Sequence, residues 1–169
     1  MSDTTANETA YLLQTFKFRV TLTPVDPEAT STALETTGAF SECSGLQLEA
    51  DVKEYMEGGR NDGVVRRVGR VKLVPLVLKR GMFSASATEK ADGSLWDWMT
   101  AMVSGAEVRR YHGQVDLMDP TLTTALATWS FDRGLPAKVV GPTLNAKTGD
   151  IAVEELHIAH EGLRLGART

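Results

Sequence analysis

The residues with the clearest potential for chemistry lie close together in the run EELHIAHE at positions 154–161. The candidate metal ligands are Glu154, Glu155, His157, His160 and Glu161. Glu154 and His157 have the E-x-x-H spacing by which helices present ligands to a pair of irons, but that site needs a second copy of the motif on another helix. The preceding alternation of Ile151 and Val153 instead indicates a strand, in which residues three apart point to opposite faces. We therefore interpret these side chains as paired or solvated surface groups.

A nucleophilic site has less support in the sequence. Cys43 and His112 are a thiol and a base that could form one, but no further signature accompanies them, and we favour Cys43 as a small residue packed at a turn. The G-x-S-x-G elbow of serine hydrolases does not occur in the sequence. Trp96, Trp98 and Trp129 have helical and strand spacing, which favours core packing over a stacking platform. We expect no enzyme activity, no metal and no cofactor.

The glycine-rich run EGGRNDG at positions 57–63 is equally unsuited to ligand chemistry. It lacks the Gly-Lys-Ser/Thr that closes a phosphate-binding loop, and it lacks the glutamate that a calcium loop carries at its twelfth position. We therefore expect this run to have a role other than binding phosphate or calcium.

The composition is that of one ordinary soluble domain. The 169 residues are 42% hydrophobic and 24% charged, and domains commonly run about 100 to 200 residues. A formal net charge of -4, without a basic stripe, disfavours nucleic-acid binding. A single cysteine cannot form an internal disulfide, which fits assembly in a reducing cytosol. The first residues contain no secretory or transit signal, and no apolar run approaches the about 20 residues of a membrane helix. We expect a flexible segment at residues 1–15 and one domain at 16–169.

Alternating apolar residues predict the first strands. Phe16, Phe18, Val20 and Leu22 alternate with polar residues, which indicates a strand with one buried face. The same alternation over residues 46–53 predicts a second half-buried strand, whose phase breaks at 54–55 and so indicates a bulge or bend before the glycine-rich loop. Residues 24–38, with two prolines and many small polar residues, predict a long loop. Residues 71–81 predict a strand with a local defect at Pro75.

One segment has a helical period. Leu95, Trp98, Met99 and Met102 recur at the spacing of one helix face and predict a short packing helix over residues 95–104. Ser94 is the expected N-cap, and Gly105 is the expected C-terminal stop.

The remaining segments predict more strands, over residues 107–119, 124–139 and 150–165, each bounded by Gly, Pro or Asn turns. The total is six or seven strands with one helix inserted midway. This order favours a mainly β fold, an antiparallel β-sandwich or small barrel with one short flanking α-helix.

Five short motifs occur in an order that resembles a known family: GAFSECSGL, YMEGGRN, LKRG, LWDWM and EELHIAHEGL. Over roughly residues 16–165 the chain resembles the inner tube proteins of contractile injection systems, found in phage tails and phage-tail-like particles. The resemblance implies two packed antiparallel sheets in a barrel-like sandwich. It also implies rings of six copies that stack into a tube, with sheath, baseplate or tube-initiator and terminator proteins as partners and a cargo effector or DNA in the lumen.

The resemblance also suggests a role for the glycine-rich arm at residues 56–70. Glycine accepts backbone angles that other residues resist, so the arm could reorganise on meeting another ring. We expect inter-subunit and inter-ring contacts from Glu57, Gly58, Gly59, Arg60 and Asn61; the alternative is a solvated hairpin loop. Two departures from the family are Val68-Gly69-Arg70, where relatives often carry Pro-Gly, and the length of the loop at 24–38.

Three other functions remain open on the sequence. The chain could be a tube-initiator or terminal ring protein, or the tube of a secretion system embedded in a bacterial envelope. From a different class, it could be a monomeric β-sandwich binding module, which would stay monomeric at every concentration.

Overall fold

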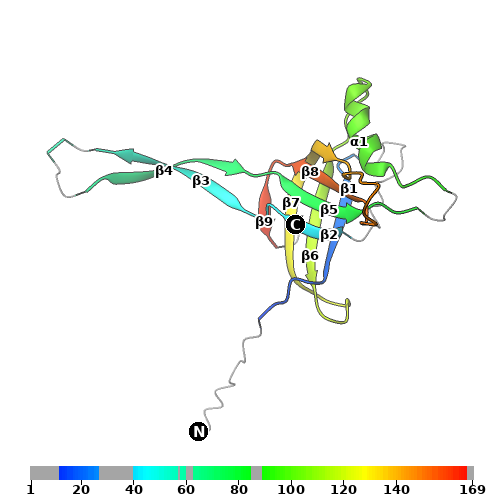
Figure 1. Ribbon diagram of the computed structural model, residues 1–169. Coiled ribbons are helices and arrows are strands. Elements are labelled where there is room, and N and C mark those ends of the chain that lie inside the picture. Colours follow the sequence, from blue (N-terminus) through cyan, green and yellow to red (C-terminus); the bar gives the residue numbers. More distant parts are fainter. Residues whose placement is uncertain (1–11, 27–39, 57, 60–62, 85–88, 167–169) are drawn as a thin grey trace, which may run out of the picture.

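The structure is a computed structural model that describes residues 12–26, 40–56, 58–59, 63–84 and 89–166. Its main body is a seven-stranded antiparallel sheet folded on itself, with strand order β1-β6-β7-β8-β5-β2 and β9 paired to β7 (Figure 1). The strands are β1 Phe18–Pro24, β2 Phe40–Ser44, β5 Leu76–Gly81, β6 Tyr111–Met118, β7 Ala125–Val140, β8 Val153–Ala159 and β9 Leu163–Leu165.

Strand β7 belongs to both halves of the folded sheet. Its first part pairs with β6 and β9, and its last part pairs with β8. The change of partner falls near Arg133, whose φ is 49°, and Gly134. A Cβ on Gly134 would lie 2.7 Å from the Phe131 ring and 2.8 Å from Ile158 Cγ2, so this position requires glycine for close packing. The bend brings the two inner faces together over one core.

The core is built by alternate residues of strands from both halves. Leu76 and Leu78 of β5, with Leu156 and Ile158 of β8, are fully buried. They pack in one cluster with residues of the other half, including Val20 on β1. Within β1 the predicted alternation is confirmed, because Val20 and Leu22 are buried and the polar residues on either side of them are exposed. Phe16 does not fit it, since it precedes the strand and is 63% exposed.

Helix α1, Ser94–Val103, covers one end of the body (Figure 1). Ser94 is the first helical residue rather than the N-cap; Gly93 occupies the cap, and Asp92 Oδ1 accepts the Ser94 N–H at 2.9 Å. The expected stop is confirmed, because Gly105 adopts φ 73° and its N–H points to the Met102 carbonyl. On the predicted packing face, Leu95 and Trp98 are buried and Met99 is half-buried, but Met102 is 42% exposed because the helix end extends past the sheet.

A long β-hairpin projects from the body (Figure 1). It consists of β3, Leu48–Tyr55, and β4, Val65–Leu73, which pair only with each other. Two sequence predictions were wrong here. The strand at 46–53 is not half-buried along its length: Leu46 packs beside the core, but Leu48, Ala50 and Val52 are exposed. The register shift lies between Ala50 and Val52, not at 54–55. Within the arm at 56–70, β4 begins at Val65.

Pro75 also separates two strands rather than interrupting one, because β4 belongs to the hairpin and β5 to the body. The described residues contain nine strands rather than six or seven: β2 was missed, β4 and β5 were merged, and so were β8 and β9. The predicted class, a mainly antiparallel β fold with one helix, is confirmed. Most of the loop predicted at 24–38, and residues 1–11 of the N-terminal segment, lie outside the described residues.

Candidate assembly surface

The five candidate metal ligands occupy different environments. Glu154 points into the core and is fully buried, whereas Glu155 lies on the outer face of β8 beside His157. The imidazole of His160 packs against Phe131, and its Nε2 lies 3.1 Å from the Val74 carbonyl oxygen. Glu161 pairs with two arginines. Among the described residues, no group of three or more His, Cys, Asp or Glu side chains is arranged to hold a metal ion.

The two residues of the candidate thiol site, Cys43 and His112, also lie in different environments. His112 Nδ1 lies 3.2 Å from Asp132 Oδ1 on the outer face of β6 and β7. Burial raises the pKa of Cys43 to about 11, which is the opposite of what a nucleophilic thiol needs. The geometry therefore does not support His112 as an activating base for Cys43.

The three tryptophans have structural roles. Trp98 packs edge-on against Tyr111, with ring centroids 4.9 Å apart, and its indole N–H donates to the Arg109 carbonyl at 2.9 Å. Trp129 packs against the core cluster. The core interpretation does not hold for Trp96, which is 40% exposed.

A buried polar network ties α1 to the sheet. Arg80 and Glu154 face each other from β5 and β8, with the Arg80 Nε 2.7 Å from Glu154 Oε1 and both side chains almost completely buried. Arg80 Nη1 also lies 3.0 Å from Asp92 Oδ2, ahead of the helix. The Trp96 indole N–H donates to Glu154 Oε2 at 3.1 Å. The network therefore holds the first helical turn in place, which is a structural role.

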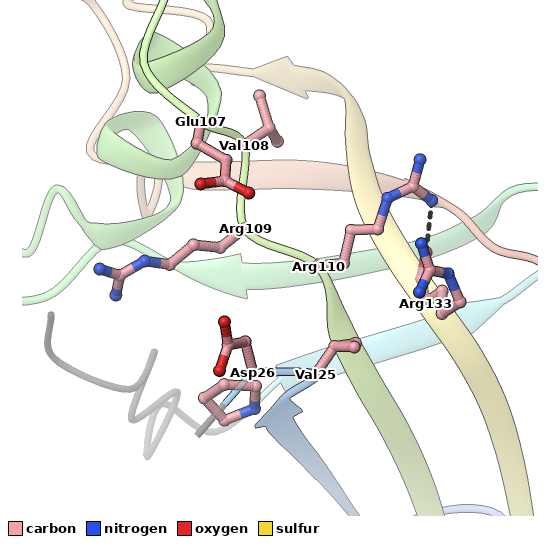
Figure 2. Close-up of a pocket in the computed structure, with 8 residues that line it drawn as sticks. Val25, Asp26, Glu107, Val108, Arg109, Arg110 and Arg133 are labelled. Atoms are coloured by element: carbon pink, nitrogen blue, oxygen red, sulfur yellow. Dashed lines mark hydrogen bonds between the residues drawn. The ribbon is translucent and has the colours of Figure 1, made fainter. Parts of the chain in front are cut away.

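A pocket of about 370 Å³ lies beside the end of β1 and the start of β6. Figure 2 shows Asp26, Glu107 and Arg109 on one side and Arg110 beside Arg133 on the other, where Arg110 donates to the Arg133 carbonyl at 3.3 Å. The three guanidinium groups are balanced by Asp26, Glu107 and Glu161, the last of which pairs with both Arg110 and Arg133. The described residues around the pocket thus offer no excess positive charge for an anion.

The projecting hairpin has two unlike faces. Three cross-strand pairs share one face and are apolar: Leu48 with Leu73, Ala50 with Val71, and Val52 with Val68. We call these six residues the hairpin apolar face. The opposite face carries charged residues, including the pair of Glu49 and Lys72.

The hairpin apolar face is open to solvent. Val52 is 60% exposed and Val68 is 80% exposed, although both have the side chains of typical core residues. Polar contacts along the rest of the ribbon hold its shape, such as Arg66 Nε to Glu54 Oε1 at 2.9 Å and Lys72 Nζ to Asp51 Oδ1 at 2.6 Å. An exposed apolar patch of this kind marks an interaction site.

Two of the predicted contact residues lie at the far end of the hairpin. Gly58 and Gly59 are exposed and form a turn, with φ 91° at Gly59. Glu57, Arg60 and Asn61 lie outside the described residues. Sequence reasoning missed the hairpin apolar face, although the alternation at residues 46–53 contained the signal; it was attributed to a buried strand face.

Comparisons with known proteins define the fold further. The family model described as T4-like virus tail tube protein gp19 matches residues 14–164. A chain in the sheath-tube complex of an extracellular contractile injection system, PVC, in the extended state, has a TM-score of 0.73 and 22% identity, covering 94% of this chain and 93% of that chain. A chain in the anti-feeding prophage cap, which terminates the AFP tube, has a TM-score of 0.74 and 21% identity, covering 99% and 100%. A chain in the six-fold symmetrised anti-feeding prophage baseplate has a TM-score of 0.74 and 19% identity, covering 93% and 97%. No curated protein sequence matches the chain.

The fold is therefore one shared with chains of contractile injection systems. Because the family model spans nearly all of the sequence, the chain belongs to the T4-like virus tail tube protein family. It is a structural tube subunit of a phage tail or phage-tail-like particle, and the resemblance found in the sequence is confirmed. Within the described residues, no helix is long and apolar enough to span a membrane.

Proposed function

We propose that six copies of this protein close into a ring and that the rings stack into the rigid inner tube of a contractile injection system. Sheath contraction would drive this tube through the envelope of a target cell while its lumen holds or conducts an effector or DNA. The observation that carries the proposal is the exposure of the hairpin apolar face. The hairpin that carries this face projects away from its own body (Figure 1).

The geometry of the hairpin favours another copy as its partner. Strands of eight and nine residues extend roughly 26 to 30 Å, so the ribbon reaches well beyond the body that carries it. Fully burying a valine or leucine contributes about 1.5–3 kcal/mol, and several such residues can offset the cost of association. A contact between the hairpin of one copy and the body of the next is head-to-tail, which is the type of contact that generates rings.

Ring closure would also cover the two unpaired edges of the sheet. Strands β1 and β2 are the two ends of the strand order, so each presents an edge that could pair in an uncontrolled way. Packing of neighbouring copies in a closed ring would cover these edges. Gly58 and Gly59 form an exposed turn that can adapt to a neighbouring ring. Inter-subunit and inter-ring contacts from these two glycines and from Glu57, Arg60 and Asn61 remain our proposal.

The relatives support the choice of partners. One similar chain comes from a sheath-tube complex and another from a baseplate, so we propose a sheath protein and baseplate proteins as partners of the tube. Assembly would take place in the bacterial cytoplasm. A second candidate function is a terminal or initiating ring, which is favoured by the equally high similarity to a chain in a tube-terminating cap.

The test is assembly of the purified protein over a concentration series, measured by negative-stain electron microscopy and light-scattering mass. A variant with Val52→Ser and Val68→Ser interrupts the hairpin apolar face, and Val103→Ser, at an 84% exposed site on α1, is the control. We expect six-fold rings or tubes from the parent and the control, and loss of assembly in the double variant. Single rings that never stack would favour the terminal-ring function, and a monomer at every concentration would contradict both.

A further inference from the structure

The end of the sandwich away from α1 has an apolar groove. Its volume is about 290 Å³, and most of its lining comes from apolar side chains of four strands and a loop, namely Phe18, Cys43, Leu46, Val115, Leu117 and Trp129. Thr15, Ser41 and Glu42 also line it. We call it the end groove. It lies where β1 and β2, the two ends of the strand order, leave the folded sheet open.

The two ends of the sandwich differ in how their core residues are covered. At one end, Leu95 and Trp98 of α1 insert into the core, and Trp98 packs against Tyr111. At the end groove, Phe18, Leu46 and Trp129 are only partly buried beside the core cluster. Apolar side chains from outside the body would complete this end as α1 completes the other.

The chain carries a matching apolar segment just before β1. Leu12 is 97% exposed, Leu13 is 49% exposed and Phe16 is 63% exposed. Thr15 lines the end groove, so the segment joins the body beside this groove. From there the chain leads away from the body toward the N-terminus (Figure 1). These side chains therefore do not fill the groove of their own chain.

We propose that the end groove receives Leu12, Leu13 and Phe16 of a neighbouring copy. The inference rests on the proposed ring assembly and names a second contact within it, separate from the hairpin. A groove of 290 Å³ suits a few side chains of one extended segment and is too small for a two-stranded ribbon, whose strands are about 4.8 Å apart before side chains are added. The contact is head-to-tail, because segment and groove are different surfaces of the same chain.

The first test compares Leu12→Ser with Leu144→Ser, since Leu144 is 86% exposed and far from the groove in sequence. At concentrations too low for assembly, both variants should unfold at the parent temperature, because neither residue is packed within its own chain. We expect Leu12→Ser to raise the concentration needed for half-assembly by about tenfold or more, as burial of a leucine predicts, and Leu144→Ser to leave it unchanged. Equal assembly of both variants would overturn the inference while leaving the proposed ring intact.

The second test uses the single native cysteine, which lines the groove. A chain with Cys43→Ser and Leu12→Cys is mixed with the parent chain, so that each copy carries one thiol, and the assembled mixture is oxidised with copper-phenanthroline in air. A disulfide-linked heterodimer can then form only between residue 12 of one copy and Cys43 of another. The control mixture carries Leu144→Cys with Cys43→Ser. Tubes that form without heterodimer above this control would overturn the inference, and a parent protein that never assembles would overturn both the inference and the proposed function.

Discussion

Replacing Glu154 by glutamine should destabilise the protein far more than a single lost charge on the surface. The Arg80 and Glu154 side chains are 1% and 0% exposed and lie 2.7 Å apart, so Glu154→Gln removes the charge that neutralises a buried guanidinium. Breaking a buried ion pair from one side commonly costs about 3–5 kcal/mol. Asp92, 3.0 Å from Arg80 Nη1 and partly exposed, remains as a second partner, which favours the lower end of this range.

We expect the free energy of unfolding to fall by about 3 kcal/mol, which lowers the midpoint of thermal unfolding by roughly 6–12 °C for a chain of this size. The measurement is thermal and urea unfolding followed by circular dichroism. Glu155→Gln is the matched control: it lies next in sequence but on the outer face, near His157 and 3.8 Å from Lys79, where an ion pair contributes at most about 1 kcal/mol.

A second variant separates the charge from the packing. Replacing both partners, with Arg80→Met and Glu154→Leu, removes the unpaired charge and should recover much of the stability lost in Glu154→Gln. If Glu154→Gln and Glu155→Gln unfold within 0.5 kcal/mol of each other, roughly the scatter of neutral surface substitutions, then the reasoning about this buried pair is refuted.

Three further predictions concern other parts of the chain. Gly113→Ala places a Cβ 1.9 Å from the Phe131 ring, so we expect a loss of stability of about 1–3 kcal/mol or more in the same unfolding assay, against no measurable loss for Gly149→Ala, where nothing lies within 4 Å. Gly69→Ala places a Cβ 2.8 Å from the Asp51 carbonyl oxygen at the register shift, and hydrogen exchange should quicken in β3 and β4 but not in the body; unchanged exchange in the hairpin would contradict this. Burial lowers the pKa of His160 below 6.5, so the folded protein binds fewer protons than the unfolded chain. The stability present above about pH 6.5 should therefore decline as the pH falls toward 5. His160→Gln should flatten this dependence of stability on pH, and an unchanged dependence would exclude His160 as its source.

Local patterns in the sequence predicted the elements whose burial follows from their own period. Val20 and Leu22 alternate with polar residues and are buried, and Leu95 and Trp98 recur at helical spacing and are buried. Gly105 marks the end of the helix because a left-handed residue is needed there. Five short motifs in fixed order also indicated the tube protein family, which the family model confirms.

The exposure of the hairpin's apolar residues could not be predicted in this way. Residues 46–53 have the same alternation as residues 16–23, yet Val20 and Leu22 of the latter are buried while the apolar residues of β3 are exposed. Strands β3 and β4 pair only with each other, and the chain joins the body sheet at β5, just after Pro75. An alternating pattern states that one face is apolar, but it does not state which molecule covers that face.

The polar interior shows the same limit at the scale of single residues. Glu154 and Glu155 are adjacent and chemically alike, and their sequence context indicated surface groups for both. The fold directs Glu154 inward toward Arg80, seventy-four residues away, and leaves Glu155 outside beside His157. From the sequence alone, period predicted a mainly β chain with one helix, and the resemblance carried by five ordered motifs indicated a tube subunit. The tertiary structure decided which apolar faces and which charges find partners within one chain, because burial depends on contacts between residues that are distant in sequence.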